Sequence, residues 1–337
     1  MRLKESNQAK QDRGHGTRQF PAADVGYPKL GEPWEGAGFQ VGDKEAGGSN
    51  GVGGPSFNAA THDRTSRLAH HVCLALFLVQ FAVVLVRLWT PSAGFWHGHW
   101  PEAILLITAT AATLSSLARE LPLQNMLLAG GLLALAGLGL ESLNAALGVP
   151  FGRIRFSPAA GPLLFDHVPW CMPFAWVASL LTARGVARFL LAPLRTNPRY
   201  GFYVLGLTVL FVSGFNVSFQ SLAVRIGHYW SWSSGPLFRG WVETPGMEWL
   251  SRAVTTLVTM ALVTPILIDK RPTPQRPLAF PLVLWLLLLV LFLTATGVNR
   301  LWSLFSIGLF QIILIAGLAW YRFQRPRHTP RNRVTPV

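Results

Sequence analysis

Long apolar windows occupy most of the sequence after its first 70 residues and restrict the folds that the chain can adopt. A helix that spans a membrane needs about 20 mostly apolar residues. About eight windows meet this requirement, at residues 72–90, 101–118, 123–147, 168–187, 201–224, 250–268, 278–297 and 301–321. Only 13% of the residues are charged, against about 25% in soluble domains, which excludes an ordinary water-soluble enzyme. The windows therefore predict an all-α, polytopic membrane helix bundle with about eight transmembrane helices.

The segment that precedes the windows, residues 1–67, differs from the rest of the chain. It is rich in Gly, contains several Pro, carries charges of both signs and has no sustained apolar period. Such a segment cannot bury enough apolar surface to offset the entropy lost on ordering. We therefore expect a disordered cytoplasmic tail, to which we assign no function because a later start codon is an open alternative. Residues 68–325 are then the transmembrane domain, and residues 326–337 a basic cytoplasmic tail.

The Lys and Arg residues between the windows indicate how the bundle is oriented. With the N-terminus in the cytoplasm, the segments on that side carry fifteen Lys and Arg, and the opposite side carries seven, Arg252 among them. This asymmetry and the even number of windows predict a multi-pass protein of the cell inner membrane with both termini cytoplasmic. The net charge of +14 then reflects topology, and we expect no nucleic-acid partner.

Seven acidic residues follow the tail, and Glu141 has the most unusual surroundings. Glu102 and Glu248 come directly after helix starts, where a carboxylate complements the helix dipole. Glu141, in contrast, closes its window after the run GGLLALAGLGL, whose small side chains let neighbouring helices approach closely. An ionisable group at such depth is costly and is by default a functional candidate. The alternative is a carboxylate that reaches the membrane interface.

Two segments rich in aromatic residues, Pro and Gly lie on the same predicted side of the membrane as Glu141. Residues 141–176 form a connection too long and too apolar for a solvent-exposed linker, which indicates a re-entrant segment or an interfacial lid. Residues 228–249 form the second segment. Their Trp residues fit either an interfacial belt or a substrate site beside the acids.

Motifs between residues 70 and 270 are similar to a known family pattern. They are Glu141, GVPFG at 148–152, GPLLF at 161–165, VP at 168–169, PFAW at 173–176, and the pair Trp230 and Trp232. This pattern resembles the integral-membrane carotenoid biosynthesis family, with carotenoid hydratases of the gamma-carotene 1'-hydroxylase and bisanhydrobacterioruberin hydratase type. The chain departs from the pattern at Ile154, at Gln220-Ser221, where the family carries Asp-Pro, and at Pro245.

The resemblance implies cofactor-independent hydration of the terminal (1,2) double bond of an acyclic carotenoid end group. A proton delivered to carbon gives a tertiary carbocation, which then takes up water. Glu141 is the expected catalytic acid, because burial disfavours the charged form of a carboxyl group, and Asp166, or His167 beside it, is expected to orient the water. Aromatic faces stabilise a nearby cation by about 0.5–2 kcal/mol. The expected substrate-binding residues are Phe151, Trp176, Trp230, Trp232 and Trp249.

The expected partners are a carotenoid or other isoprenoid lipid, the membrane, and other carotenoid biosynthesis enzymes. We expect no cofactor and no metal. The histidine pairs His70-His71 and His97/His99 lie on opposite predicted faces, about 30 Å apart, and no Asp-rich box for a magnesium diphosphate occurs. The open alternatives are a non-catalytic transporter or isoprenoid-binding protein, and another carotenoid end-group enzyme such as a cyclase. A transporter is disfavoured because the sequence shows no internal repeat and few charges in mid-span.

Overall fold

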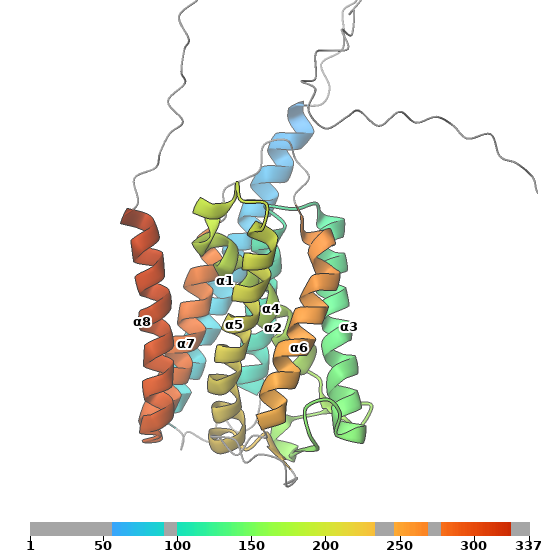
Figure 1. Cartoon of the computed structure of the whole chain (residues 1–337), viewed down its shortest axis with the longest axis vertical. Helices are drawn as coiled ribbons and strands as arrows, with labels where there is room; N and C mark the ends of the chain where they lie inside the picture. The colour runs from blue at the N-terminus through green and yellow to red at the C-terminus, as the bar shows by residue number, and fades with distance from the viewer. Residues whose placement is uncertain (1–55, 91–99, 233–245, 269–277, 325–337) are drawn as a thin grey trace, which may run out of the picture. The chain divides into compact units, whose positions relative to one another are not determined.

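The structure is a computed structural model that describes residues 56–90, 100–232, 246–268 and 278–324. Within these ranges, eight long α-helices lie side by side in one bundle (Figure 1). They are α1 (Ser56–Trp89), α2 (Trp100–Leu117), α3 (Leu123–Leu147), α4 (Met172–Leu190), α5 (Tyr200–Ser221), α6 (Gly246–Val263), α7 (Phe280–Val298) and α8 (Trp302–Gln324). Each helix overlaps one predicted window, so the all-α bundle is confirmed.

Helix α4 is the centre of the bundle. It contacts α2, α3, α5 and α7, and most of its residues are buried. Because neighbouring helices cover it, its surface does not need the apolar character that lipid demands of an outer helix. This explains why α4 is the exception among the eight, while seven helices of the described ranges are long and apolar enough to cross a membrane. The protein is therefore a multi-pass membrane protein.

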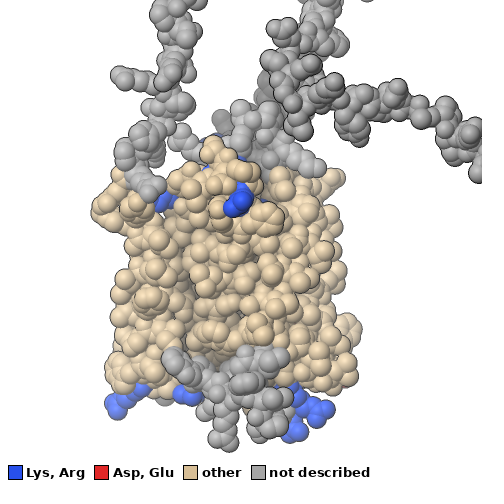
Figure 2. Space-filling model, in the orientation of Figure 1, with Lys and Arg blue, Asp and Glu red and all other residues tan. Residues whose placement is uncertain are grey.

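The outer surface of the bundle fits a lipid environment. On the face shown in Figure 2, the Lys and Arg side chains of the described residues gather at the two ends, and a broad uncharged band separates them. Large apolar side chains, such as Leu135 on α3, Leu210 on α5 and Val254 on α6, are exposed in the middle of their helices. Exposed apolar residues over so wide a band are typical of a membrane-spanning surface.

Several boundaries differ from the expected windows. Helix α1 begins at Ser56, inside the segment expected to be a tail. Residues 1–55 of that tail and the whole of the second expected tail, residues 326–337, lie outside the described residues. Helix α5 continues into a π-helical turn, η4 (Leu222–Ile226). Helix α6 tightens into a 3-10 turn, η5 (Thr264–Leu267), where Pro265 has no backbone N–H for an α-helical hydrogen bond.

Short strands organise the connections at one end of the bundle. Between α3 and α4 lie β1 (Ile154–Phe156), the 3-10 turn η2 (Pro158–Ala160), β2 (Leu163–Leu164) and β3 (Val168–Pro169). Strand β2 pairs with β3, and β1 pairs antiparallel with β4 (Trp230–Trp232), which follows η4. In this register Ile154 is opposite Trp232 and Phe156 is opposite Trp230. The two Pro- and aromatic-rich segments are therefore joined into one structure. At the other end, η3 (Ala192–Leu194) connects α4 to α5.

Candidate functional site

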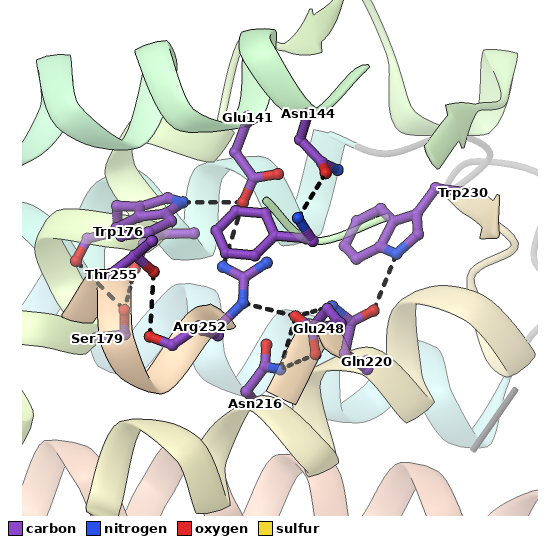
Figure 3. A network of polar contacts seen from close by, with 12 residues as sticks. Glu141, Asn144, Trp176, Ser179, Asn216, Gln220, Trp230, Glu248, Arg252 and Thr255 are labelled. Atoms are coloured by element: carbon purple, nitrogen blue, oxygen red, sulfur yellow. Dashed lines mark hydrogen bonds and ion pairs between the residues drawn. The ribbon is translucent and has the colours of Figure 1, made fainter. Parts of the chain in front are cut away.

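Arg252 on α6 lies between two buried carboxylates (Figure 3). Its Nε donates a hydrogen bond to Oε1 of Glu248 over 2.6 Å, and its Nη1 donates to Oε1 of Glu141 over 3.2 Å. Glu141 is 2% exposed and Glu248 is fully buried. Removing such charges from water costs several kcal/mol per ion, and the shared guanidinium offsets this cost. The three side chains therefore form one buried ionic cluster that connects α3 to α6.

Two amide side chains on α5 complete the surroundings of Glu248. Asn216 donates from Nδ2 to both carboxylate oxygens, over 3.0 and 3.0 Å, and Gln220 donates from Nε2 to Oε1 over 3.3 Å. Asn216 and Gln220 are four residues apart on one helix, so they present their amides on the same face. The Oε1 of Gln220 in turn accepts a hydrogen bond from Nε1 of Trp230 over 3.0 Å. Glu248 is thus surrounded by donors, as suits an ionised carboxylate.

Glu141 has fewer partners, and they share one oxygen. Nε1 of Trp176 donates to Oε1 over 3.1 Å, and this is the atom that also accepts from Arg252. The second oxygen, Oε2, forms no hydrogen bond with any residue of the described ranges (Figure 3). Glu141 also lines a cavity. One oxygen is therefore fixed by two donors, while the other remains available to a molecule in the cavity.

Aromatic rings enclose the guanidinium of Arg252. The Cζ atom lies 4.3 Å from the ring centroid of Phe151 and 5.4 Å from that of Trp176, distances at which a cation is attracted to the ring face. Phe151 is held by its backbone N–H, which donates to Oδ1 of Asn144 over 3.0 Å. Because Asn144 follows Glu141 by three residues on α3, it ties the GVPFG motif to the helix that carries the acid.

The small side chains of α3 allow Trp176 to reach Glu141. A Cβ atom on Gly137 would lie 2.4 Å from Cγ of Trp176, whereas one on Gly139 would meet nothing within 4 Å. Gly137 precedes Glu141 by one helical turn, so the indole packs over the glycine and its N–H faces the carboxylate. The sequence predicts that the Gly-rich run lets neighbouring helices approach closely. In the structure, the helices that approach in this way are α3 and α4.

We expect the substitution Gly137→Ala to destabilise the protein, because the methyl group forces Trp176 out of its position. Overpacking of this kind costs about 1–3 kcal/mol, and the displaced indole would lose its hydrogen bond to Glu141. Thermal unfolding of the purified protein in detergent measures the effect. Gly139→Ala is the matched control and should be neutral or slightly stabilising, since alanine favours the helix more than glycine does. Equal melting temperatures for the two variants would contradict this packing.

Two adjoining cavities meet beside the cluster. The first is lined by Glu141, Arg252, Asn216 and Gln220 together with aromatic side chains. The second has almost entirely apolar walls from α2, α4, α5 and α7. Their walls share Met172, Ser179, Phe215, Phe219 and Trp230. A polar chamber therefore adjoins an apolar one, which suits a long apolar molecule with one reacting end.

Polar groups on the wall of the second cavity are neutral or paired. Burial, with a smaller contribution from the nearby Glu102 carboxylate, raises the pKa of the Tyr229 phenol, which therefore keeps its proton. Glu102 accepts a hydrogen bond from Arg87 over 2.6 Å. Glu102 therefore has a direct ion-pair partner in addition to the helix dipole that the sequence suggests for it. The second cavity thus presents no unpaired charge from these groups to an apolar ligand.

The structure brings some of the expected site residues to these cavities. Glu141, Trp176 and Trp230 line the first one, and Phe151 is buried beneath Arg252. Trp232 is partly buried on β4, outside the walls of both cavities.

Asp166 and Trp249 lie elsewhere. Asp166 is exposed in the turn between β2 and β3, where it adopts a φ of 58°. Trp249 is 45% exposed on the outer side of α6. Neither lines either cavity.

Two residues of the cluster, Arg252 and Glu248, and the two amides beside it, Asn216 and Gln220, are not among the site residues expected from sequence. Arg252 is counted there as a cation of the outer side, and Glu248 as a carboxylate at a helix start. Glu248 does lie in the first turn of α6, and the structure adds that it is fully buried and pairs with Arg252, whose side chain is 13% exposed. No role is expected from sequence for Asn216 and Gln220, although Gln220 occupies a position at which the chain departs from the family pattern. The sequence does contain a signal for these residues. Asn216 and Gln220 are four positions apart, as are Glu248 and Arg252, and this spacing places two polar groups on one face of an apolar helix.

Comparison with known proteins gives one match. Residues 101–315 match the model of a family described as carotenoid biosynthesis protein. The matched range contains the whole ionic cluster, both cavities and the paired strands β1 and β4. No curated protein and no solved structure matches the chain.

Proposed function

Because the chain belongs to the carotenoid biosynthesis protein family, we propose that it adds water to the terminal (1,2) double bond of an acyclic carotenoid end group. Membership gives the protein a role in carotenoid biosynthesis, and the seven apolar helices found in the described ranges fit a lipid substrate. One observation carries the proposal: an acid with one unbonded oxygen, Glu141, lines a polar chamber that adjoins an apolar cavity.

The charges of the cluster support a proton on Glu141. Two carboxylates and one guanidinium, if all ionised, leave one negative charge uncompensated in a buried place, which is unfavourable. A single proton balances them. Glu248 accepts four hydrogen bonds from Arg252, Asn216 and Gln220, whereas Glu141 accepts two, both at Oε1. We therefore assign the proton to Oε2 of Glu141.

The proposed reaction begins with the end group in the first cavity and the polyene chain in the second. Oε2 of Glu141 transfers its proton to the less substituted carbon of the double bond, and the positive charge forms on the tertiary carbon. The resulting carboxylate and the rings of Trp176 and Trp230, which line the same cavity, stabilise this cation. A water molecule then binds to the cation through oxygen and releases one proton, which restores Glu141. The net change is the addition of one water.

Thr256 is our candidate for the residue that positions the water. It lines the first cavity one helical turn after Arg252, and its hydroxyl is buried with no hydrogen-bond partner among the described residues. A buried hydroxyl without a partner is costly, and a water in the cavity would satisfy it. Asp166, the candidate from sequence, lies outside both cavity walls, so the proposal gives this role to Thr256.

We expect Thr256→Val to lower the rate of hydration about tenfold, the effect of losing one hydrogen bond to the reacting water. Its melting temperature should not fall, since valine has the same shape and removes an unpaired hydroxyl. Thr255→Val is the matched control, because the Thr255 hydroxyl donates to the backbone oxygen of Arg252. Equal rates in both variants would exclude Thr256 from water binding. The readout is product formed per amount of folded protein.

The function itself can be tested by expressing the full chain in a bacterium engineered to accumulate lycopene or gamma-carotene. Pigments are separated by liquid chromatography and identified by mass spectrometry. A new product heavier by one water is the expected result. A product of unchanged mass with a different retention time would instead indicate a cyclase. An unchanged pigment profile with folded, membrane-inserted protein would favour a transporter or binding protein.

We also propose that the protein resides in the cell inner membrane with both termini in the cytoplasm. The start of α1 and the end of α8 lie at the same end of the bundle (Figure 1), as the excess of Lys and Arg on one side requires. The ionic cluster is then near the opposite face, since it involves the end of α3 and the start of α6.

A further inference from the structure

A third cavity, of about 900 Å³, lies at the end of the bundle opposite the ionic cluster. It is bounded by the last turns of α4, the start of α5 and the end of α6. Three arginines, Arg184, Arg188 and Arg195, line it together with Tyr200. We propose that this cavity binds the phosphate group of an anionic phospholipid, independently of the reaction proposed above.

The strongest reason is the incomplete pairing of Arg184. The residue is 7% exposed, and its Nη2 donates to the backbone oxygen of Leu267 over 3.0 Å. It forms no ion pair with any residue of the described ranges. Its neighbour Arg188, in contrast, lies 2.6 Å from Glu120. Glu120 also attracts Arg184 at longer range, so among the described residues one carboxylate is shared by two arginines. Burial of the charge that remains is costly, and an anion in the cavity would balance it.

The form of the cavity favours a lipid over a free anion. The other walls, apart from Gly201, Thr208 and Thr264, are apolar side chains of α5, of α6 and of the segment that follows α6: Val204, Leu205, Met260, Leu267 and Ile268. Ile268 is half exposed on the outer surface of the bundle. Guanidinium groups bind phosphate oxygens in pairs, while the apolar walls suit an acyl chain. Inorganic phosphate could also bind the guanidinium groups, but it has no acyl chain to contact the apolar walls.

The location also agrees with a phospholipid. This end of the bundle is the one at which the count of Lys and Arg predicts the cytoplasm, and Figure 2 shows Lys and Arg side chains at it. Basic pockets between transmembrane helices on the cytoplasmic side bind anionic headgroups. The uncompensated charge, the apolar walls and the position thus point to one class of ligand.

The test uses the purified full chain in detergent with added dioleoyl phosphatidylglycerol or dioleoyl phosphatidylcholine, and native mass spectrometry counts the bound lipids. We expect phosphatidylglycerol to be retained in preference to phosphatidylcholine. Arg184→Met should lower the affinity for phosphatidylglycerol at least about fivefold, since each basic residue contributes about 1 kcal/mol to anionic lipid binding. Arg199→Gln is the matched control, because Arg199 is exposed near this cavity but does not line it, and it should retain the lipid.

Three results would overturn the proposal. They are equal retention of both lipids, unchanged binding in Arg184→Met, and displacement of phosphatidylglycerol by millimolar inorganic phosphate, which would indicate a soluble anion. The melting temperature gives a second readout: phosphatidylglycerol should raise it in the unmodified protein and not in Arg184→Met. If Arg184→Met does not fold, Arg184→Gln replaces it with the same expected loss of affinity.

Discussion

Glu141→Gln is expected to lower the formation of hydrated carotenoid at least about a hundredfold, the usual minimum contribution of a general acid. Glutamine keeps the shape of the side chain and an oxygen that can accept from Trp176 and Arg252, but it has no proton to give to carbon. The measurement is product per amount of folded protein, by liquid chromatography and mass spectrometry of extracted pigments.

The control for this variant is Glu120→Gln. Glu120 is also a buried carboxylate with an arginine partner, but it pairs with Arg188 at the other end of the bundle. It should retain most of the activity. Full activity in Glu141→Gln would remove Glu141 from the role of acid, and equal losses in both variants would indicate a general loss of folding.

Arg252→Gln is expected to have the largest effect on stability. The guanidinium hydrogen-bonds to Glu141 and Glu248, and its removal leaves two buried acids without their shared cation. Breaking a buried ion pair in this way costs about 3–5 kcal/mol. Thermal unfolding in detergent should show a large fall in melting temperature, and the double variant Arg252→Gln/Glu248→Gln should recover part of it because one acid is also removed.

A comparison with a more exposed pair separates burial from the loss of charge. Arg87 and Glu102 are 2.6 Å apart, with side chains 22% and 19% exposed. Arg87→Gln should therefore lower the melting temperature less than Arg252→Gln does, because water partly replaces the lost partner of Glu102. If both variants melt at the same temperature, the cluster around Arg252 does not have the stabilising role that we assign to it.

The fold could be predicted from sequence because each transmembrane helix is encoded locally, in a continuous apolar window. Helix α4 shows the limit of this rule. Its window has the weakest apolar character, since the residues that cover it come from other helices. The burial of Glu141 could also be predicted, because its depth and the adjacent Gly-rich run are both visible in the sequence.

The partners of Glu141 could not be predicted in the same way. Arg252 and Glu141 are 111 positions apart in the sequence, and their contact depends on how α3, α4 and α6 pack. The rotation of α6 decides that Glu248 and Arg252 point inward while Trp249 points outward. Likewise, Asp166 follows two motifs of the family, but the tight turn between β2 and β3 directs it to the surface. Such choices depend on tertiary packing, not on the local pattern.

The most direct test of the central claim is the source of the added oxygen. Membranes that contain the full chain are incubated without dioxygen, with lycopene or gamma-carotene, in water enriched in heavy oxygen. Hydration should give a product heavier by one water that carries the heavy oxygen, and Glu141→Gln membranes should form almost none of it. A product that forms only with dioxygen and takes its oxygen from that gas, or no product in membranes with folded protein, would contradict the hydration proposed here.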